Sequence, residues 1–393
     1  MNFRPTLSIA PMASAALASS ILISACVHAP QANTEQPAAM QGQAAVSPKS
    51  PAVNDVAVVS DETREPAKAH VTLPDQADWR DLYDIGENLD LTRPDIKLTL
   101  SSGGSSVYAV VNQNGKAIGA VLPPNAATKL AGEIMAFNLA RAVGVADIYQ
   151  PAVYHRLQGA NLKAFTNLVP KSPIGKPKSL KEQNRVAVLA LIKKNPGGID
   201  TAFKMFGAKP NDYDALVNWK ANKFETSHKL PGSKTAFAEF LKCKGAKPSS
   251  SVNVTVAKGT SNELAMARQL SSIFLIDALT QQWDRFSGGN LQTSTKDGVV
   301  SFAANDNGGT WGGTAWTNKF LAIVTRFDRG VAERILEMEE LFTKNRSFLG
   351  IQTESEFIHA MNVEKFPTEF KAFKKSLTLV ADHIRKHQGC YFD

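Results

Sequence analysis

The most constraining feature of the sequence is a set of three short apolar segments joined by turn signals. Residues 96–100 and 107–111 are rich in β-branched and other apolar side chains, which is typical of strands. Asn114-Gly115 then predicts a two-residue hairpin turn, because both residues accept positive φ angles. Residues 117–122 form a third candidate strand, which a Pro-Pro pair ends. The sequence therefore predicts an antiparallel meander.

A single helix is expected after this meander. Over residues 128–143 the apolar side chains recur at helical spacing, and Gly144 is a typical helix stop. Two further candidate strands, 150–157 and 164–169, come next. Residues 73–170 are thus expected to form a β-rich part with one helix.

The second half of the chain has a different pattern. Residues 171–260 are rich in Lys and broken by Pro and Gly, and we expect a basic, mostly helical insertion there. An apolar helix is predicted over 262–282 and a short hairpin over 291–303, with further helices beyond. Residues 261–393 are therefore expected to be mainly helical, which makes the fold class α+β.

The N-terminus has the pattern of an export signal. One basic side chain, Arg4, precedes an uncharged apolar stretch that ends in Ser24-Ala25-Cys26. This resembles a bacterial lipoprotein signal, which implies removal of residues 1–25 and attachment of lipid to the Cys26 thiol. Val27 after the cysteine favours the outer membrane of the cell envelope, facing the periplasm. An ordinary signal peptide and an uncleaved anchor are the alternatives.

The next segment and the other two cysteines fit an exported protein. Residues 26–72 contain no aromatic residue and are rich in Ala, Pro and Gln, so a flexible tether is expected. If Cys26 carries lipid, Cys243 and Cys390 remain, and they predict one disulfide. Two free thiols are the alternative.

The charge of the chain is mildly basic. A net charge of +8 suits anionic partners such as phosphates, acidic glycans or lipid headgroups, although it also serves solubility. The sequence has no zinc-ligand spacing and no alternation of basic and aromatic residues, so no nucleic-acid partner is expected.

Three polar pieces interrupt the apolar elements. Glu133 borders the apolar face of the predicted helix, where a carboxylate needs a cation or a metal unless it is simply exposed. Asp284 follows the long apolar helix, and Asn290 precedes the predicted hairpin. Asp306 opens Asp306-Asn307-Gly308 after a strand, a position that suits a divalent metal. For each aspartate, a turn or cap role is the alternative.

The order of these pieces matters more than any one of them. A Gly-rich hairpin, a helix with an inward Glu, a loop Asp, a second hairpin and an Asp-Asn-Gly loop follow the order of parts in protein kinases. Residues 131–141 resemble the corresponding helix of the secretory-pathway kinases, the Golgi casein kinase and four-jointed group. Asp277 through Asp284-Arg285 is similar to their Asp-x6-Asp-Arg segment, and Asp306-Asn307-Gly308 to their metal-binding loop. HipA-type and phosphoinositide-kinase-like kinases share this layout.

The resemblance implies a two-lobed kinase-like fold, with a small β-rich N-lobe and a larger, mainly helical C-lobe. By that resemblance Asp284 is the catalytic base, and Glu133 positions the nucleotide-binding group. Asp306 and Asn290 are the implied ligands of Mg²⁺ or Mn²⁺ bound with ATP. Gly103 and Gly104 would cover the phosphates.

Two positions depart from the family pattern. The kinases carry a Lys near the end of the third strand, where this chain has Pro123, which has neither charge nor donor. Lys116 and Lys129 are the candidates to replace it. The His that often follows Asp-Arg in the family is Phe286 here.

Three hypotheses for function follow. The first is a metal-dependent phosphoryl transfer from a nucleotide to a protein, glycan or lipid acceptor in the envelope. The second is an inactive, kinase-shaped scaffold or binding lipoprotein, which the missing lysine favours. The third is a structural lipoprotein whose motifs are chance turns. Convergence of Glu133, Asp284 and Asp306 on one site separates the first two from the third.

Overall fold

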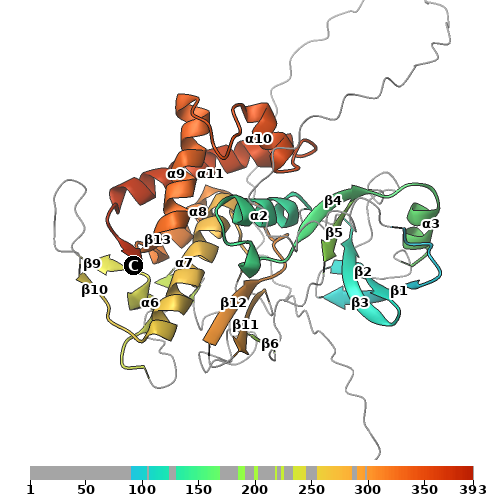
Figure 1. Ribbon diagram of the computed structural model, residues 1–393, viewed down its shortest axis with the longest axis horizontal. Coiled ribbons are helices and arrows are strands. Elements are labelled where there is room, and N and C mark those ends of the chain that lie inside the picture. The colour runs from blue at the N-terminus through green and yellow to red at the C-terminus, as the bar shows by residue number, and fades with distance from the viewer. Residues whose placement is uncertain are drawn as a thin grey trace, which may run out of the picture.

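The chain forms a five-stranded sheet and a larger, mainly helical part, with one helix lying between them (Figure 1). The computed structural model describes residues 90–103, 106–123, 130–168, 185–190, 199–201, 217–218, 223–224, 233–244, 255–285, 290–296 and 299–392. The expected signal peptide, the lipid-bearing Cys26 and the tether lie outside these ranges. An α+β fold with a β-rich first part and a mainly helical second part is therefore confirmed.

The sheet contains the predicted meander. Its order is β1-β2-β3-β5-β4 and every pairing is antiparallel. Asn114 and Gly115 have φ angles of 50° and 78°, so the β2–β3 turn has the positive φ angles that the pair predicts. The strands are β1 (Ile96–Gly103), β2 (Ser106–Gln113), β3 (Lys116–Leu122), β4 (Ala152–Arg156) and β5 (Arg185–Ala190).

The expected strand over 164–169 is wrong, because this segment belongs to helix α3 (Gly159–Leu168). Leu162, Phe165 and Leu168 recur every third residue and pack on one side of the sheet, with Phe165 fully buried. A six-residue window is too short to separate this period from that of a strand.

The expectation of a mostly helical insertion over 171–260 is also wrong for the residues that the structure describes there. They form β5, α6 (Phe237–Phe240) and five strands of two or three residues. These strands are β6 (Ile199–Thr201), β7 (Val217–Asn218), β8 (Lys223–Phe224), β9 (Cys243–Lys244) and β10 (Thr255–Val256). β5 lies between β3 and β4, because its run Arg-Val-Ala-Val-Leu-Ala is apolar enough for a central strand.

The helical part is built around α7 (Ser261–Thr280), the predicted apolar helix. Thr260 and Glu263 form a reciprocal capping box at its start, which satisfies two backbone donors. Nearly every residue from Met266 onward is buried, against α2, α8, α11 and β12. The remaining helices are α2 (Leu130–Ala142), α8 (Thr314–Ile323), α9 (Arg329–Lys344), α10 (Glu354–Ala360) and α11 (Pro367–Lys386). In the described ranges, no helix is both long and apolar enough to cross a membrane.

A second predicted hairpin comes after the loop that follows α7 and leads into another polar loop. β11 (Leu291–Lys296) and β12 (Val299–Ala304) pair in full antiparallel register, and β6 adds a third strand. The chain ends in a short parallel pair of β13 (Phe327–Asp328) and β14 (Tyr391–Phe392). The loop after α7 and the loop after β12 therefore lie next to each other.

Helix α2 joins the sheet to the helical part. All its residues are buried, and it packs against α7, β4 and β5. Tyr108, Ala120 and Leu122 of the sheet belong to the same apolar cluster as α2. A helix buried on all sides has little freedom to shift, so Glu133 is held at a defined position.

Candidate functional site

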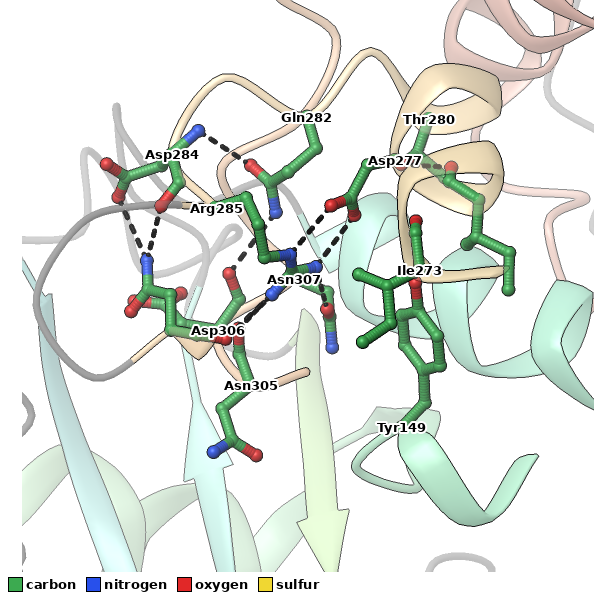
Figure 2. A network of polar contacts seen from close by, with 12 residues as sticks. Tyr149, Ile273, Asp277, Thr280, Gln282, Asp284, Arg285, Asn305, Asp306 and Asn307 are labelled. Carbon is green, nitrogen blue, oxygen red and sulfur yellow. Dashed lines mark hydrogen bonds and ion pairs between the residues drawn. The ribbon is translucent and has the colours of Figure 1, made fainter. Parts of the chain in front are cut away.

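The candidate site lies where three segments meet: the loop after α7, the loop after β12 and the first turn of α2. Figure 2 shows the contacts between the first two of these segments. The three acidic residues singled out in the sequence each belong to one of these segments. The geometry therefore brings together Glu133, Asp284 and Asp306, which are far apart in the chain.

Arg285 is the centre of this arrangement and is completely buried. Its guanidinium makes a bidentate ion pair with Asp277, whose two carboxylate oxygens are each 2.8 Å away. Burial alone would lower the pKa of Arg285, but the Asp277 carboxylate raises it above its ordinary value. Burial raises the pKa of Asp277, and the Arg285 charge opposes that rise. A bidentate arginine–carboxylate pair is both strong and geometrically specific.

The same guanidinium also binds the two polar loops. Its Nη1 donates to the carbonyl oxygens of Asn290 at 2.9 Å and Asn305 at 2.8 Å. Its Nη2 donates to Oδ1 of Asn307 at 2.6 Å. Figure 2 shows Arg285 between Asp277 on α7 and the loop of Asn305 and Asn307. One buried cation therefore sets the position of the Asp284 loop relative to the Asp306 loop.

Glu133 is held by backbone groups of the Asp306 loop. Its carboxylate accepts the N–H of Asn307 at 3.1 Å and that of Gly308 at 2.9 Å. Gly132 permits this approach, because a Cβ there would lie 2.6 Å from the Asn307 carbonyl oxygen and would collide with the Thr310 side chain. Glu133 thus clamps the Asp-Asn-Gly loop onto α2.

The carboxyl groups of Glu133 and Asp306 both have raised pKa values. Burial, and then the negative charge of Asp306, raise the pKa of Glu133 to about 8, although two backbone N–H groups and Arg285 oppose the rise. Burial also raises the pKa of Asp306, and Arg285 opposes that rise. Asp306 has a φ of 46°, a left-handed conformation that is uncommon outside glycine. Two mutually repelling carboxylates, of which Asp306 has a left-handed backbone, are typical of a functional site.

Asp284 lies at the partly exposed side of the same network. Its backbone N–H donates to Oε1 of Gln282 at 3.0 Å, and its carbonyl oxygen accepts from Nδ2 of Asn290 at 2.8 Å. Gly309 packs so closely that a Cβ there would lie 2.5 Å from the Asp284 Cβ. The carboxylate is therefore held beside the Asp306 loop while it keeps access to solvent.

The donor set fits a divalent cation. The Oδ1 atom of Asn290 is buried and has no hydrogen-bond partner among the described residues. The backbone carbonyl oxygen of Asn290 accepts the N–H of Asn305, the residue before Asp306. An amide oxygen and carboxylates are the ligands that Mg²⁺ and Mn²⁺ take in proteins. Within the described ranges no group of three His, Cys, Asp or Glu side chains could hold a metal alone. A cation here would therefore need further oxygen ligands, such as phosphates.

Of the two expected replacements for the missing lysine, the structure describes Lys116, which lies away from this site. Lys116 is exposed at the hairpin end of β3, the opposite end from Leu122. The residues of β3 that face α2 are Ala120 and Leu122, and Pro123 is buried beside them. Gly103 pairs with Ser106 at the turn between β1 and β2, which the register places at the same end of the sheet as Leu122. Gly104, Lys129 and Phe286 lie outside the described residues.

Two other residues of the site were not singled out from the sequence. Gln282 holds the Asp284 backbone and also reaches the Asp306 carbonyl oxygen at 3.4 Å. Gln281 ends α7 in a left-handed conformation, and its Oε1 accepts the N–H of Gly313 at 3.0 Å. Polar residues directly after a long apolar helix were the available signal.

Cys243 and Cys390, the two cysteines of the predicted disulfide, are in contact, since their side chains share a hydrogen bond. Both are free thiols in the structure.

Two solved structures are similar to this chain at low identity. The structure of hydra Fam20 with sugar has 15% sequence identity and a TM-score of 0.45, with 78% of this chain and 89% of that chain covered. HipA of Shewanella oneidensis MR-1, solved with HipB and operator DNA, has 10% identity and a TM-score of 0.33 over 74% of this chain and 64% of its own. No protein-family model and no curated protein matches the sequence. The comparisons place the chain in no family.

Proposed function

We propose that the chain is a kinase-like phosphotransferase that uses a nucleotide and a divalent metal. The observation that carries this proposal is the convergence of Glu133, Asp284 and Asp306 around one buried arginine. Their order in the sequence and their elements match the parts of a kinase site. A set of chance turns would have left these three residues apart.

Asp284 is the proposed catalytic base. Its carboxylate is partly exposed, so the hydroxyl group of an acceptor can reach it. In the transfer, Asp284 accepts the hydroxyl proton while the acceptor oxygen attacks the terminal phosphorus of the nucleotide. The bond between that phosphorus and the oxygen of the leaving nucleoside diphosphate breaks in the same step.

Asp306 and Asn290 are the proposed metal ligands. A cation there would supply positive charge to the phosphate oxygens when nucleotide is bound. Glu133 acts as a positioning residue, because it holds the backbone of the Asp306 loop through two hydrogen bonds.

A nucleotide-binding pseudokinase is the second candidate. Pro123, which stands where the secretory-pathway kinases carry their lysine and is buried next to Leu122, favours it. This candidate predicts nucleotide binding without transfer.

The test is a thermal-shift titration of the full-length chain with ATP and Mn²⁺ or Mg²⁺. A ligand that binds only the folded state raises the melting temperature. We expect a metal-dependent rise in the wild type, loss of that rise in Asp306→Asn, and retention of it in Asp284→Asn. Phosphate transfer to a mixture of envelope glycans and proteins then separates the kinase from the pseudokinase. No rise with any metal, in a folded chain, contradicts both.

The acceptor and the location are part of the same proposal. A lipid on Cys26 would hold the domain at the periplasmic face of the outer membrane, with a protein, glycan or lipid headgroup as acceptor. Incorporation of labelled fatty acid into the wild type and its loss in Cys26→Ser tests the anchor. Equal labelling of both chains contradicts it.

A further inference from the structure

Two thiols from distant parts of the chain meet in the helical part, and the proposed site does not use them. Cys243 opens β9 and Cys390 directly precedes β14. The two side chains are hydrogen-bonded to each other. Cys390 is fully buried and Cys243 is half-buried.

A third segment, residues 325–327, holds both cysteines in place. The backbone N–H of Cys243 donates to the Thr325 hydroxyl at 3.0 Å. The N–H of Phe327 donates to the Cys390 carbonyl oxygen at 2.9 Å, where β13 and β14 pair. The N–H groups of Thr325 and Arg326 both donate to the Leu241 carbonyl oxygen, at 2.9 and 3.0 Å. Because the backbone is held on both sides, the two thiols stay in contact.

We propose that Cys243 and Cys390 form a structural disulfide that fastens the C-terminal strand β14 to the segment leading into α7. Each thiol gives up one proton and one electron as the S–S bond forms. The two electrons reduce the disulfide of an oxidoreductase or of oxidised glutathione to two thiols, through a mixed disulfide with one of the cysteines.

The surroundings indicate a permanent link and not a switch. Burial raises the pKa of both thiols, and a thiol of high pKa is a poor leaving group when a reductant attacks its disulfide. The bond therefore resists reduction once it has formed during folding. Arg326, whose guanidinium lies 4.3 Å from the Phe392 ring, lies over the chain end beside Cys390. Such links persist in oxidising compartments and not in the cytosol, so the bond also indicates where the domain works.

The test is peptide mapping of the full-length chain after folding in a glutathione buffer poised as in a secretory compartment. Free thiols are alkylated, and a glutamate-specific protease then releases residues 240–263 and 370–393, each with one of the two cysteines. Without reductant we expect these peptides as one linked species, two hydrogen masses below their sum. Reductant should separate them. Separate, alkylated peptides, or linkage of either to Cys26, would overturn the proposal.

Melting curves then test the structural role. Reductant should lower the melting temperature of the wild type by several degrees, because the bond joins residues far apart in the chain. Cys243→Ser and Cys390→Ser should melt at one temperature with and without reductant. If Cys390→Ser does not fold, the half-buried Cys243→Ser carries the comparison. A linked wild type that melts identically in both conditions would contradict a stabilising link.

Discussion

The buried ion pair between Asp277 and Arg285 gives the sharpest prediction. Both side chains are at most 1% exposed, and Arg285 holds two loops through three further acceptors. Asp277→Ala leaves a buried cation without its carboxylate. Breaking such a pair from one side costs about 3–5 kcal/mol. This is a large share of the roughly 5–15 kcal/mol by which native proteins are stable.

The assay is equilibrium unfolding of the full-length chain in urea, followed by tryptophan fluorescence and circular dichroism. Arg334→Ala is the matched control, because it breaks an ion pair of similar length, 2.9 Å, between half-exposed partners. Exposed pairs contribute about 0–1 kcal/mol, so the control should stay near the wild type.

A double variant separates stability from function. Asp277→Leu with Arg285→Met removes both charges, and a buried pair replaced by apolar residues is often nearly neutral. We expect it to regain only part of the stability lost in Asp277→Ala, because the three further acceptors of Arg285 lose their donor, and none of the metal-dependent nucleotide response. The reasoning is refuted if Asp277→Ala costs no more than Arg334→Ala.

Two more predictions concern α2. Gly132→Ala should destabilise the chain by about 1–3 kcal/mol in urea unfolding, since its Cβ would collide with the Asp306 loop. The control Gly330→Ala, whose Cβ has room, should be neutral or stabilising. Equal changes in the free energy of unfolding for the two variants would contradict the predicted collision. The raised pKa of Glu133 predicts that the metal-free folded state keeps a proton that the unfolded state releases above its ordinary pKa of 4.5. The free energy of unfolding should therefore fall between about pH 5 and pH 8, by at most about 1.4 kcal/mol per pH unit, and less steeply in Glu133→Gln. Parallel profiles for the two chains would exclude Glu133 as the group responsible.

Local chemistry in the sequence was enough to predict much of the fold. The Asn114-Gly115 turn, the apolar helix α7 and the β11–β12 hairpin each carry a signal within a few residues of the element they define. β5 carried such a signal too, a run of apolar residues, but the Lys-rich composition around it suggested an insertion of another kind. Its place between β3 and β4 depends on pairing over a long distance, which local patterns do not encode.

The candidate site was predictable in its residues but not in its contacts. Glu133, Asp284 and Asp306 could be selected because a carboxylate beside an apolar element loses solvation and needs a polar or charged partner. The partners of Glu133 are backbone N–H groups, which no residue type reveals. In the sequence, Arg285 stands out only as part of the Asp-Arg motif. Its central role depends on the carbonyl oxygens of Asn290 and Asn305, which the motif does not indicate.

The most direct test of the account is a crystal structure of the chain with Mn²⁺ and a non-hydrolysable ATP analogue, with the metal located by its anomalous scattering. We expect a Mn²⁺ peak bound by Asp306 and by Oδ1 of Asn290, with the terminal phosphate facing Asp284. A metal and nucleotide bound elsewhere, or a site that stays empty at saturating ligand, would contradict it.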